Sequence, residues 1–349
     1  MNLQRLKASH FRTIIDGEFN LESPVTFILG ENAHGKTNLL EAVYFVIMGE
    51  GFRDSREEQL ITFGSQDAVV RADFKEKETT THFQIFLKRT TNSAIEKIYT
   101  VNKTKKNHHQ YLALSTRAVL FSPDQILIMI GSPEIRRSYF DRVISSFDAE
   151  YRKRLINYEN ALRRRNKILE HHLKVESLKE ELSFWDVYLA EQAAYLVQGR
   201  QGYIDFLNRN PKVEQKEFTI EYRKNELTVD RLEERFEEER RYRKTLIGPQ
   251  KDEYVISQKE SGGEKNLHHF GSRSEQRLAI YWLKLNEART YEERSGIRPI
   301  LLLDDIFSEL DAHNKRLTLK TIHTYQTILT TTEHETVDLV KDDKNVLSL

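Results

Sequence analysis

Several features that would point to particular classes of protein are missing from this chain of 349 residues. It has no cysteine, which excludes disulfides, thiol catalysis and zinc sites built from cysteine. It has no run of about 18 apolar residues, so we expect no membrane partner and no membrane-spanning segment. The segment Met1–Lys7 lacks the apolar region of a secretory signal peptide, and the cytoplasm is therefore the expected location.

A net charge is missing as well. The 54 Lys and Arg residues balance 54 Asp and Glu residues, so the chain as a whole lacks the basic footprint of a nucleic-acid-binding domain. Any DNA site must come from local clustering of basic residues. With 38% hydrophobic and 31% charged residues, the composition suits a helix-rich soluble protein, and the length allows two domains.

What the chain does contain, near its start, is a phosphate-binding loop. The apolar run Val25–Leu29 predicts a strand, and it leads directly into the pattern G-x-x-x-x-G-K-[ST]. Apolar residues then recur at helical spacing over 39–47. Because strand, loop and helix come in the order that the motif requires, a chance match is disfavoured. The residues expected to bind nucleotide are Gly30, Glu31, Asn32, Ala33, His34, Gly35, Lys36, Thr37 and Asn38.

The chemistry of a triphosphate explains these residue types. Gly30 and Gly35 permit backbone turns that a side chain would obstruct. The N–H groups of residues 33–37 can then face the phosphates at the positive end of the following helix. Lys36 supplies an ammonium group for the β- and γ-phosphates in catalysis, and the Thr37 hydroxyl is placed for Mg²⁺.

A second motif lies far along the chain, where the apolar run Ile300–Leu303 leads into Asp304 and Asp305. Four apolar residues in a row predict a buried strand of a parallel sheet. Adjacent carboxylates at its end need a cation or solvent to compensate them. We assign Asp304 to Mg²⁺, directly or through water, and Asp305 to polarising the attacking water. An Asp pair that caps the next helix is the alternative, but together with the phosphate loop the pair predicts an ATPase with ATP and Mg²⁺ as ligands.

ABC-type ATPases complete the site with a Ser- and Gly-rich turn at a helix N-terminus, contributed by a second subunit, and two stretches compete for this role. The stretch 261–265 has the more familiar letters, but only 271–277 is followed by an amphipathic helix, over 278–287. We therefore predict a turn between short strands at 261–264. The expected signature residues, acting on the nucleotide of the partner subunit, are Ser272, Ser274 and Gln276.

These motifs predict an α/β fold, a P-loop ABC-type ATPase head with an inserted helical lobe. We expect the N-terminal part of the ATPase domain at 1–115, the helical lobe at 116–246 and the C-terminal part of the ATPase domain at 247–349. Charge-rich helical patterns run from about 132 to about 244, with a break near 208–211, and 231–241 is predicted to be a solvated helix. The lobe is too short and too broken for a coiled-coil arm.

Several further segments resemble the RecF family of recombination and replication-repair ATPases, which is related to SMC proteins. The most specific are the loop block continued by Leu39–Ala42, the segment Gly131–Asp141, and Leu301–Asp311. Other matching segments are His10–Arg12, Phe52–Arg53, Leu60–Gly64, Phe121–Asp124, Gly248–Pro249 and Thr330–Thr332.

The resemblance implies further properties. Two subunits would sandwich two ATP molecules in an ATP-dependent homodimer, closure would shape a surface for duplex or gapped DNA, and slow DNA-dependent hydrolysis would release it. A RecR-like recombination mediator would be a partner. Ser308 and Asp311 would form the D-loop, and Thr331 would belong to the switch segment.

Two residues depart from the family pattern. Ser274 stands where the family usually has Gly, which puts the strength of dimerisation in question. Asn32-Ala33 stands where Asn-Gly is usual, a change that we expect to be mild. Asp305, where many ABC ATPases have Glu, agrees with the family and suggests slow hydrolysis.

Candidate DNA contacts are basic residues of the lobe. A run of three arginines spreads around a helix, so only some of them can face one ligand. The first two candidates have a structural alternative, pairing with acids such as Asp141. Contacts would be mostly to phosphates and therefore salt-sensitive. The candidates are Arg136, Arg137, Arg163, Arg164, Arg165 and Lys167.

Three other functions remain open at this stage. A transporter-type ABC ATPase is disfavoured by the long helical insertion and the absence of a recognisable coupling segment. An SMC-like tether would need long heptad arms. A nucleotide-gated DNA- or protein-binding module with vestigial hydrolysis stays possible, because of Ser274 and Asp305.

Overall fold

The computed structural model describes residues 1–53, 56–90, 94–171, 175–213, 215–309, 315, 318, 323–340 and 343–349. The chain divides into two compact units, the first formed by Met1–Asp124 and Glu287–Leu349 and the second by Gln125–Asn286. The second unit thus extends beyond the expected lobe of 116–246. The physical reason is that the strand after Gly248 pairs with a strand of the lobe and not with the ATPase sheets.

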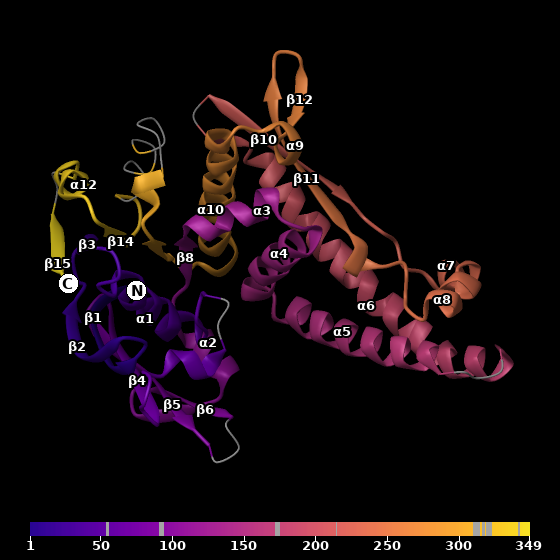
Figure 1. Cartoon of the computed structure of the whole chain (residues 1–349), viewed down its shortest axis with the longest axis horizontal. Helices are drawn as coiled ribbons and strands as arrows, with labels where there is room; N and C mark the ends of the chain where they lie inside the picture. The colour runs from indigo at the N-terminus through magenta and orange to yellow at the C-terminus, as the bar shows by residue number, and fades with distance from the viewer. Residues whose placement is uncertain are drawn as a thin grey trace. The chain divides into compact units, whose positions relative to one another are not determined.

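An antiparallel sheet of six strands forms one layer of the first unit, in the order β2-β1-β4-β5-β6-β7 (Figure 1). Buried and exposed side chains alternate along its longer strands, as expected for a sheet with one face on the core. The strands are β1 Asn2–Phe11, β2 Ile14–Asn20, β4 Asp67–Glu76, β5 Thr79–Arg89, β6 Ile95–Val101 and β7 Thr104–Lys106.

The second layer is a five-stranded sheet in the order β15-β3-β14-β13-β8, and all of its pairings are parallel. Four of its strands are buried along their whole length, which fits their continuous apolar runs. The strands are β3 Val25–Leu29, β8 Ala118–Phe121, β13 Ile300–Leu303, β14 Thr327–Thr331 and β15 Lys344–Ser348.

Helix α1, Lys36–Met48, contacts both sheets and contributes to a single core with them. Residues 39–47 are all buried, so the helix is apolar on every side except at Glu41. Gly49 ends it in the left-handed conformation with φ 76°, and its N–H donates to the Phe45 carbonyl. The other helical elements of this unit are η1 Glu57–Leu60, α2 His108–Leu114, η2 Pro123–Ile126 at the boundary, η4 Ile306–Glu309 and α12 His334–Asp338.

The second unit combines helices with a four-stranded sheet in the order β12-β11-β10-β9. Helices α5 and α6 pack against each other along much of their length (Figure 1). The helices are α3 Leu127–Ile130, α4 Pro133–Phe147, α5 Ala149–Glu170, α6 Val175–Arg209, α7 Val229–Glu234, α8 Phe236–Tyr242 and α9 Leu267–Phe270, with η3 Pro249–Lys251. Helix α10, Arg273–Ser295, begins in this unit and ends in the first. The strands are β9 Lys212–Val213, β10 Lys216–Arg223, β11 Glu253–Glu260 and β12 Gly263–Asn266.

The helical pattern expected up to about Lys244 is wrong over strand β10. Phe218 and Ile220 are buried on alternate positions, and β10 pairs with β11 over Phe218–Arg223. Phe218 also stacks on Trp282 of α10, at 5.4 Å between ring centroids. Pairing with a strand that begins 30 residues further on determines the conformation of this segment, and the charge-rich local sequence does not indicate that pairing.

The segment 231–241 is also not the single solvated helix that we expected. It forms α7 and α8 with a break at Arg235, and Leu232, Phe236 and Glu239 are buried. Glu239 accepts a hydrogen bond of 2.6 Å from Arg165 Nη1 of α5. Surface pairs do occur, between Arg235 and Glu238 and between Glu237 and Arg240.

A buried charge network holds the second unit together around Arg200 of α6. Its guanidinium pairs with Asp141 of α4 at 2.8 Å and with Asp252 at 2.6 Å. Tyr151 donates to the same Asp141. We had expected Asp141 to be a partner of Arg136, but Arg136 pairs with Glu253 instead, at 2.9 Å. Removing one member of such a network leaves an uncompensated buried charge.

Among the described residues, no helix is both long enough and apolar enough to cross a membrane.

Candidate nucleotide-binding site

The order of strands in the parallel sheet brings the two distant motifs to one edge. Strand β14 pairs with β3 on one side and with β13 on the other. Parallel strands end at the same edge of a sheet, so Gly30 after β3 and Asp304 after β13 flank the end of β14. Thr330 and Thr331, the last residues of β14, lie between them.

The side chains of the two motifs meet directly. The Thr37 hydroxyl donates to Asp304 Oδ1 at 2.9 Å, and the Thr330 hydroxyl donates to the same oxygen at 3.0 Å. The backbone N–H of Asp305 donates to the Thr330 hydroxyl at 2.8 Å. A hydroxyl and a carboxylate at this separation form the kind of hard-oxygen donor set that Mg²⁺ prefers, which fits the roles predicted for Thr37 and Asp304.

The phosphate loop takes up the strained backbone that its motif requires. Gly35 has φ 93° and Ala33 has φ 70°. A Cβ atom at Gly30 would lie 2.9 Å from the Leu349 carbonyl oxygen, so this position has no room for a side chain. Ala33 is in the left-handed conformation, where the Cβ atom of a non-glycine residue costs about 1–2 kcal/mol. The mild effect expected of this residue stays a prediction.

Lys36 lies within the loop and is 7% exposed. Its ammonium group donates to the carbonyl oxygens of Gly30 and Glu31, at 2.8 Å each. The His34 N–H, one of the amides expected to face the phosphates, donates to the Glu31 carbonyl at 3.4 Å. These contacts fold the loop around the lysine at the N-terminus of α1.

The two aspartates differ in their surroundings. Burial raises the pKa of Asp304, opposed by the hydrogen bonds from Thr37 and Thr330 and by the charge of Arg53. Asp305 is less buried and has φ 47°, a conformation that is uncommon outside glycine. Such backbone strain often accompanies functional sites.

Two arginines and one glutamate behind the loop were not assigned a site role from the sequence. Glu41 of α1 is fully buried and accepts bonds from Arg12 at 2.8 and 3.0 Å and from Arg53 at 3.0 and 2.6 Å. Arg53 also donates to the Asn38 side chain. The arginines thus brace the first turns of the helix that carries the loop. A lone acid inside the apolar run 39–47 was the signal that such partners must exist.

The signature segment belongs to the second unit. Ser272 caps α10: its hydroxyl accepts from the Glu275 N–H at 3.3 Å, and its own N–H donates to the Glu275 carboxylate at 2.7 Å. Lys265 pairs with the same carboxylate at 2.9 Å. Ser274 is exposed, whereas Gln276 is buried and donates to the Leu267 carbonyl at 2.8 Å. Gln276 therefore helps to fix the turn in front of the helix.

The competing stretch 261–265 has the structure predicted for it. Strands β11 and β12 form a hairpin whose turn contains residues 261 and 262, and Gly263 begins β12 with φ 126°. No helix of comparable length starts there among the described residues, since α9 covers only Leu267–Phe270.

The remaining site predictions have mixed outcomes. Thr331 is buried at the end of β14, and its hydroxyl accepts from the Glu333 N–H at 3.0 Å. Ser308 lies in η4, and its side chain is outside the described residues. Asp311 is outside the described residues altogether.

The basic candidates for DNA separate into buried and exposed groups. Arg136 and Arg137 serve the structure of the unit, because Arg136 pairs with Glu253 and Arg137 donates to the Asp252 carbonyl at 2.8 Å. Arg165 is fully buried between Asp186 and Glu239, at 2.6 Å from each. The exposed candidates on α5 are Arg163, Arg164 and Lys167.

Sequence comparisons agree with this geometry. A family model described as the RecF/RecN/SMC N terminal domain matches residues 2–348. A DNA replication and repair protein RecF from Clostridium botulinum (strain Alaska E43 / Type E3) is 30% identical over 360 residues, covering 99% of this chain and 97% of that relative. A protein of the same name from Alkaliphilus oremlandii (strain OhILAs) is 28% identical, with 99% and 98% covered. The chain belongs to the RecF family.

Solved structures of the RecF family have the same fold. One, described as the recombination mediator protein RecF-ATPrS in the RecFOR pathway, matches with a TM-score of 0.86 at 27% identity, covering 99% of this chain and 95% of that one. A second, described as RecF-ATP, matches with a TM-score of 0.83 at 29% identity, covering 95% and 92%. An SMC head domain from Pyrococcus furiosus matches at 17% identity with a TM-score of 0.53. The predicted α/β fold of an ABC-type ATPase head is confirmed.

Proposed function

We propose that this RecF-family chain is a slow, DNA-dependent ATPase of recombinational repair and replication restart. It dimerises around ATP on duplex or gapped DNA and releases the DNA on hydrolysis. The observation that carries this proposal is the contact between Thr37 of the phosphate loop and Asp304 of the distant strand. It assembles, from segments 267 residues apart, the donor pair that a magnesium-nucleotide complex needs.

Each loop and strand residue then has a chemical task. Lys36 exchanges its two carbonyl contacts for the phosphates, and the amides at the start of α1 face the same charges. Thr37 and Asp304 hold Mg²⁺, which when bound neutralises charge on the phosphate oxygens. Asp305 orients the attacking water, and its positive φ of 47° is the kind of backbone strain found at functional sites.

The second subunit supplies the rest of the site in this proposal. Ser272, Ser274 and the N-terminus of α10 face the γ-phosphate of the partner's ATP, with Gln276 holding the turn behind them. Ser308 and Asp311 serve as the D-loop and Thr331 as part of the switch. DNA phosphates contact Arg163, Arg164 and Lys167, and a RecR-like mediator is the protein partner. The RecFOR pathway named for the solved relatives supports that last assignment.

A second function has one specific observation in its favour. Ser274 is exposed at a position where the family usually has Gly, and its side chain limits how closely a γ-phosphate can approach. The chain would then be a nucleotide-gated binding module with vestigial hydrolysis. Full ATP-dependent DNA affinity without measurable phosphate release would select this function.

The test is binding of a labelled gapped duplex with no nucleotide, with ADP and with ATP. We expect tight binding with ATP alone, and its loss in Lys36→Ala. Lys7→Ala, a substitution of a partly exposed lysine of β1 outside the loop, is the matched control and keeps the ATP effect. ATP binding without any change in DNA affinity would refute the proposal.

A further inference from the structure

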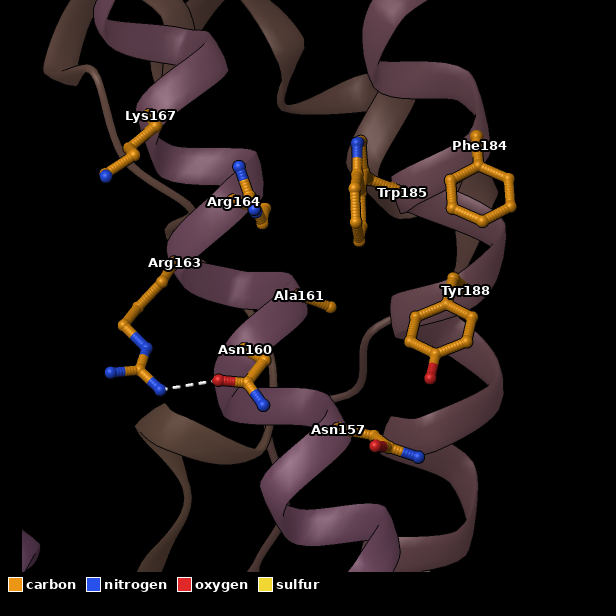
Figure 2. Close-up of a pocket in the computed structure, with 9 residues that line it drawn as sticks. All are labelled: Asn157, Asn160, Ala161, Arg163, Arg164, Lys167, Phe184, Trp185 and Tyr188. Atoms are coloured by element: carbon orange, nitrogen blue, oxygen red, sulfur yellow. Dashed lines mark hydrogen bonds between the residues drawn. The ribbon is translucent and has the colours of Figure 1, made fainter.

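The most unusual surface outside the nucleotide site is a pocket between α5 and α6, which we call the hairpin pocket. Its volume is about 730 Å³. Figure 2 shows the basic residues of α5 on one side and three aromatic rings of α6 on the other. It is lined by Asn157, Asn160, Ala161, Arg163, Arg164, Lys167, Phe184, Trp185 and Tyr188.

The aromatic side of the pocket exposes more apolar surface than the fold requires. Phe184 is 64% exposed, and its ring stacks on Tyr188 with 6.0 Å between centroids and 15° between planes. Trp185 stands nearly perpendicular to Phe184 at 5.2 Å and also packs on the small core of the hairpin. The rings thus form a platform that is anchored at Trp185. Exposed clusters of large apolar side chains commonly mark binding sites.

The basic side carries positive charge that the fold neutralises only in part, since Glu159 one turn earlier on α5 interacts with Arg163. The lining contains three cationic side chains and no acid. Within the described residues, neither Arg164 nor Lys167 forms an ion pair, and Arg163 donates to Asn160 at 2.6 Å. The neighbouring acid Asp186 points into the hairpin, where Arg165 pairs with it. Among the described residues, the charges of Arg164 and Lys167 therefore remain unpaired next to the aromatic platform.

From these two features we infer that the hairpin pocket binds single-stranded nucleic acid. Bases stack on Phe184 and Tyr188, while the phosphates lie along Arg163, Arg164 and Lys167. A duplex offers no free base face to such a platform, whereas a single strand does. The inference rests on the proposed function in so far as that function requires DNA, and it assigns this pocket to the single-stranded part of a gapped substrate. Binding of the single strand in this pocket requires neither ATP nor ADP.

Trp185 provides a direct reporter of occupancy. The chain has two tryptophans, and the other, Trp282, is fully buried against Phe218. Titration of the full chain with a 15-nucleotide oligo(dT), without ATP or ADP, is expected to quench the emission of the half-buried Trp185, with an affinity that falls as salt is raised. Trp185→Phe keeps an aromatic ring, so binding measured by anisotropy of a labelled oligo(dT) stays within about threefold while the quenching is lost.

Matched substitutions distinguish binding at this pocket from non-specific electrostatic attraction between the chain and the oligonucleotide. Phe184→Ala is expected to weaken oligo(dT) binding by roughly fivefold or more, as loss of base stacking does. Phe63→Ala removes a fully exposed phenylalanine of the first unit and has no effect. Lys167→Ala weakens binding and lowers the salt dependence, because one phosphate contact is lost. Lys153→Ala, on the same helix but outside the pocket, changes neither by more than about twofold.

The outcomes also separate this inference from the proposed ATP-dependent function. Lys36→Ala should leave oligo(dT) binding intact, and Phe184→Ala should leave intact the increase in affinity that ATP causes on duplex DNA without a gap. Quenching that persists when the ATP effect fails would support the pocket and refute the clamp. Equal binding in wild type and Phe184→Ala, or competition by an acidic peptide as strong as by oligo(dT), would overturn the inference.

Discussion

Substitution Glu41→Gln tests the bracing of the phosphate loop most directly. The Glu41 side chain is fully buried and receives four side-chain hydrogen bonds from Arg12 and Arg53. Glutamine keeps the shape but removes the charge and places an N–H₂ group against guanidinium donors. Breaking a buried ion pair costs about 3–5 kcal/mol. Arg53 is 37% exposed and can regain water, so we expect the lower end of this range, about 3 kcal/mol.

Thermal unfolding of the full chain measures this loss. For a unit of about 150–250 residues, 1 kcal/mol corresponds to about 2–4 °C, so the transition of the first unit should fall by about 6–12 °C. Glu18→Gln is the matched control, because Glu18 is about half exposed and pairs with Arg5 and Lys7 on the surface. It should cost less than about 1 kcal/mol. A loss for Glu41→Gln no larger than that of the control would refute the bracing role.

Three further results are expected. Ala33→Gly should raise the free energy of unfolding by up to about 1 kcal/mol in urea titrations, because relief of the left-handed strain exceeds the entropy cost of glycine. Lys77→Gly, also at positive φ but in an exposed turn, should have the same effect. Destabilisation by both substitutions would contradict this reasoning. Ser274→Gly should strengthen ATP-dependent self-association several-fold in analytical ultracentrifugation, and an unchanged dimer constant would show that the serine is tolerated. Burial raises the pKa of Asp304, so the folded chain holds that proton to higher pH than the unfolded chain: the contribution of Asp304 to stability falls, and Mg²⁺-dependent ATP affinity rises, as pH increases through the raised pKa. Calorimetric titration should show this rise in wild type and not in Asp304→Asn.

The nucleotide site was largely predictable because its determinants are local. The phosphate loop and the strand before Asp304 are short motifs, and their glycines and apolar runs indicate the backbone conformation directly. The predicted signature was separable from the stretch at 261–265 because only it is followed by an amphipathic helix, and Ser272 does cap that helix, α10. The sheet order that joins the motifs then follows from parallel pairing.

The errors share a physical origin in long-range partners. Strand β10 was predicted to be helical because its strand conformation depends on pairing with β11. Contacts of Trp282 with Phe218 and of Asn286 with Asn210 likewise join part of α10 to the second unit, which ends at Asn286. Asp141 pairs with Arg200 of a helix almost 60 residues away, although an arginine at helical spacing was nearer in sequence. The φ of Ala33 could not be predicted either, because a φ value is a property of the folded loop and not of the residue alone.

The run Arg163–Arg165 shows both what the sequence predicts and what it does not. Helical spacing already requires that adjacent residues point in different directions, and the inward position of Arg165 follows from its phase with buried Ala161 and Ile168. Its acids, Asp186 and Glu239, come from two other helices and could not be chosen from the sequence. The partners of the outward-facing Arg164 could not be predicted from the sequence either. Arg164 lines a pocket with the rings of Phe184 and Trp185 only because α6 packs along α5. Identical neighbours in a sequence thus acquire opposite tasks, one balancing charge inside the hairpin and the other leaving charge beside an aromatic surface.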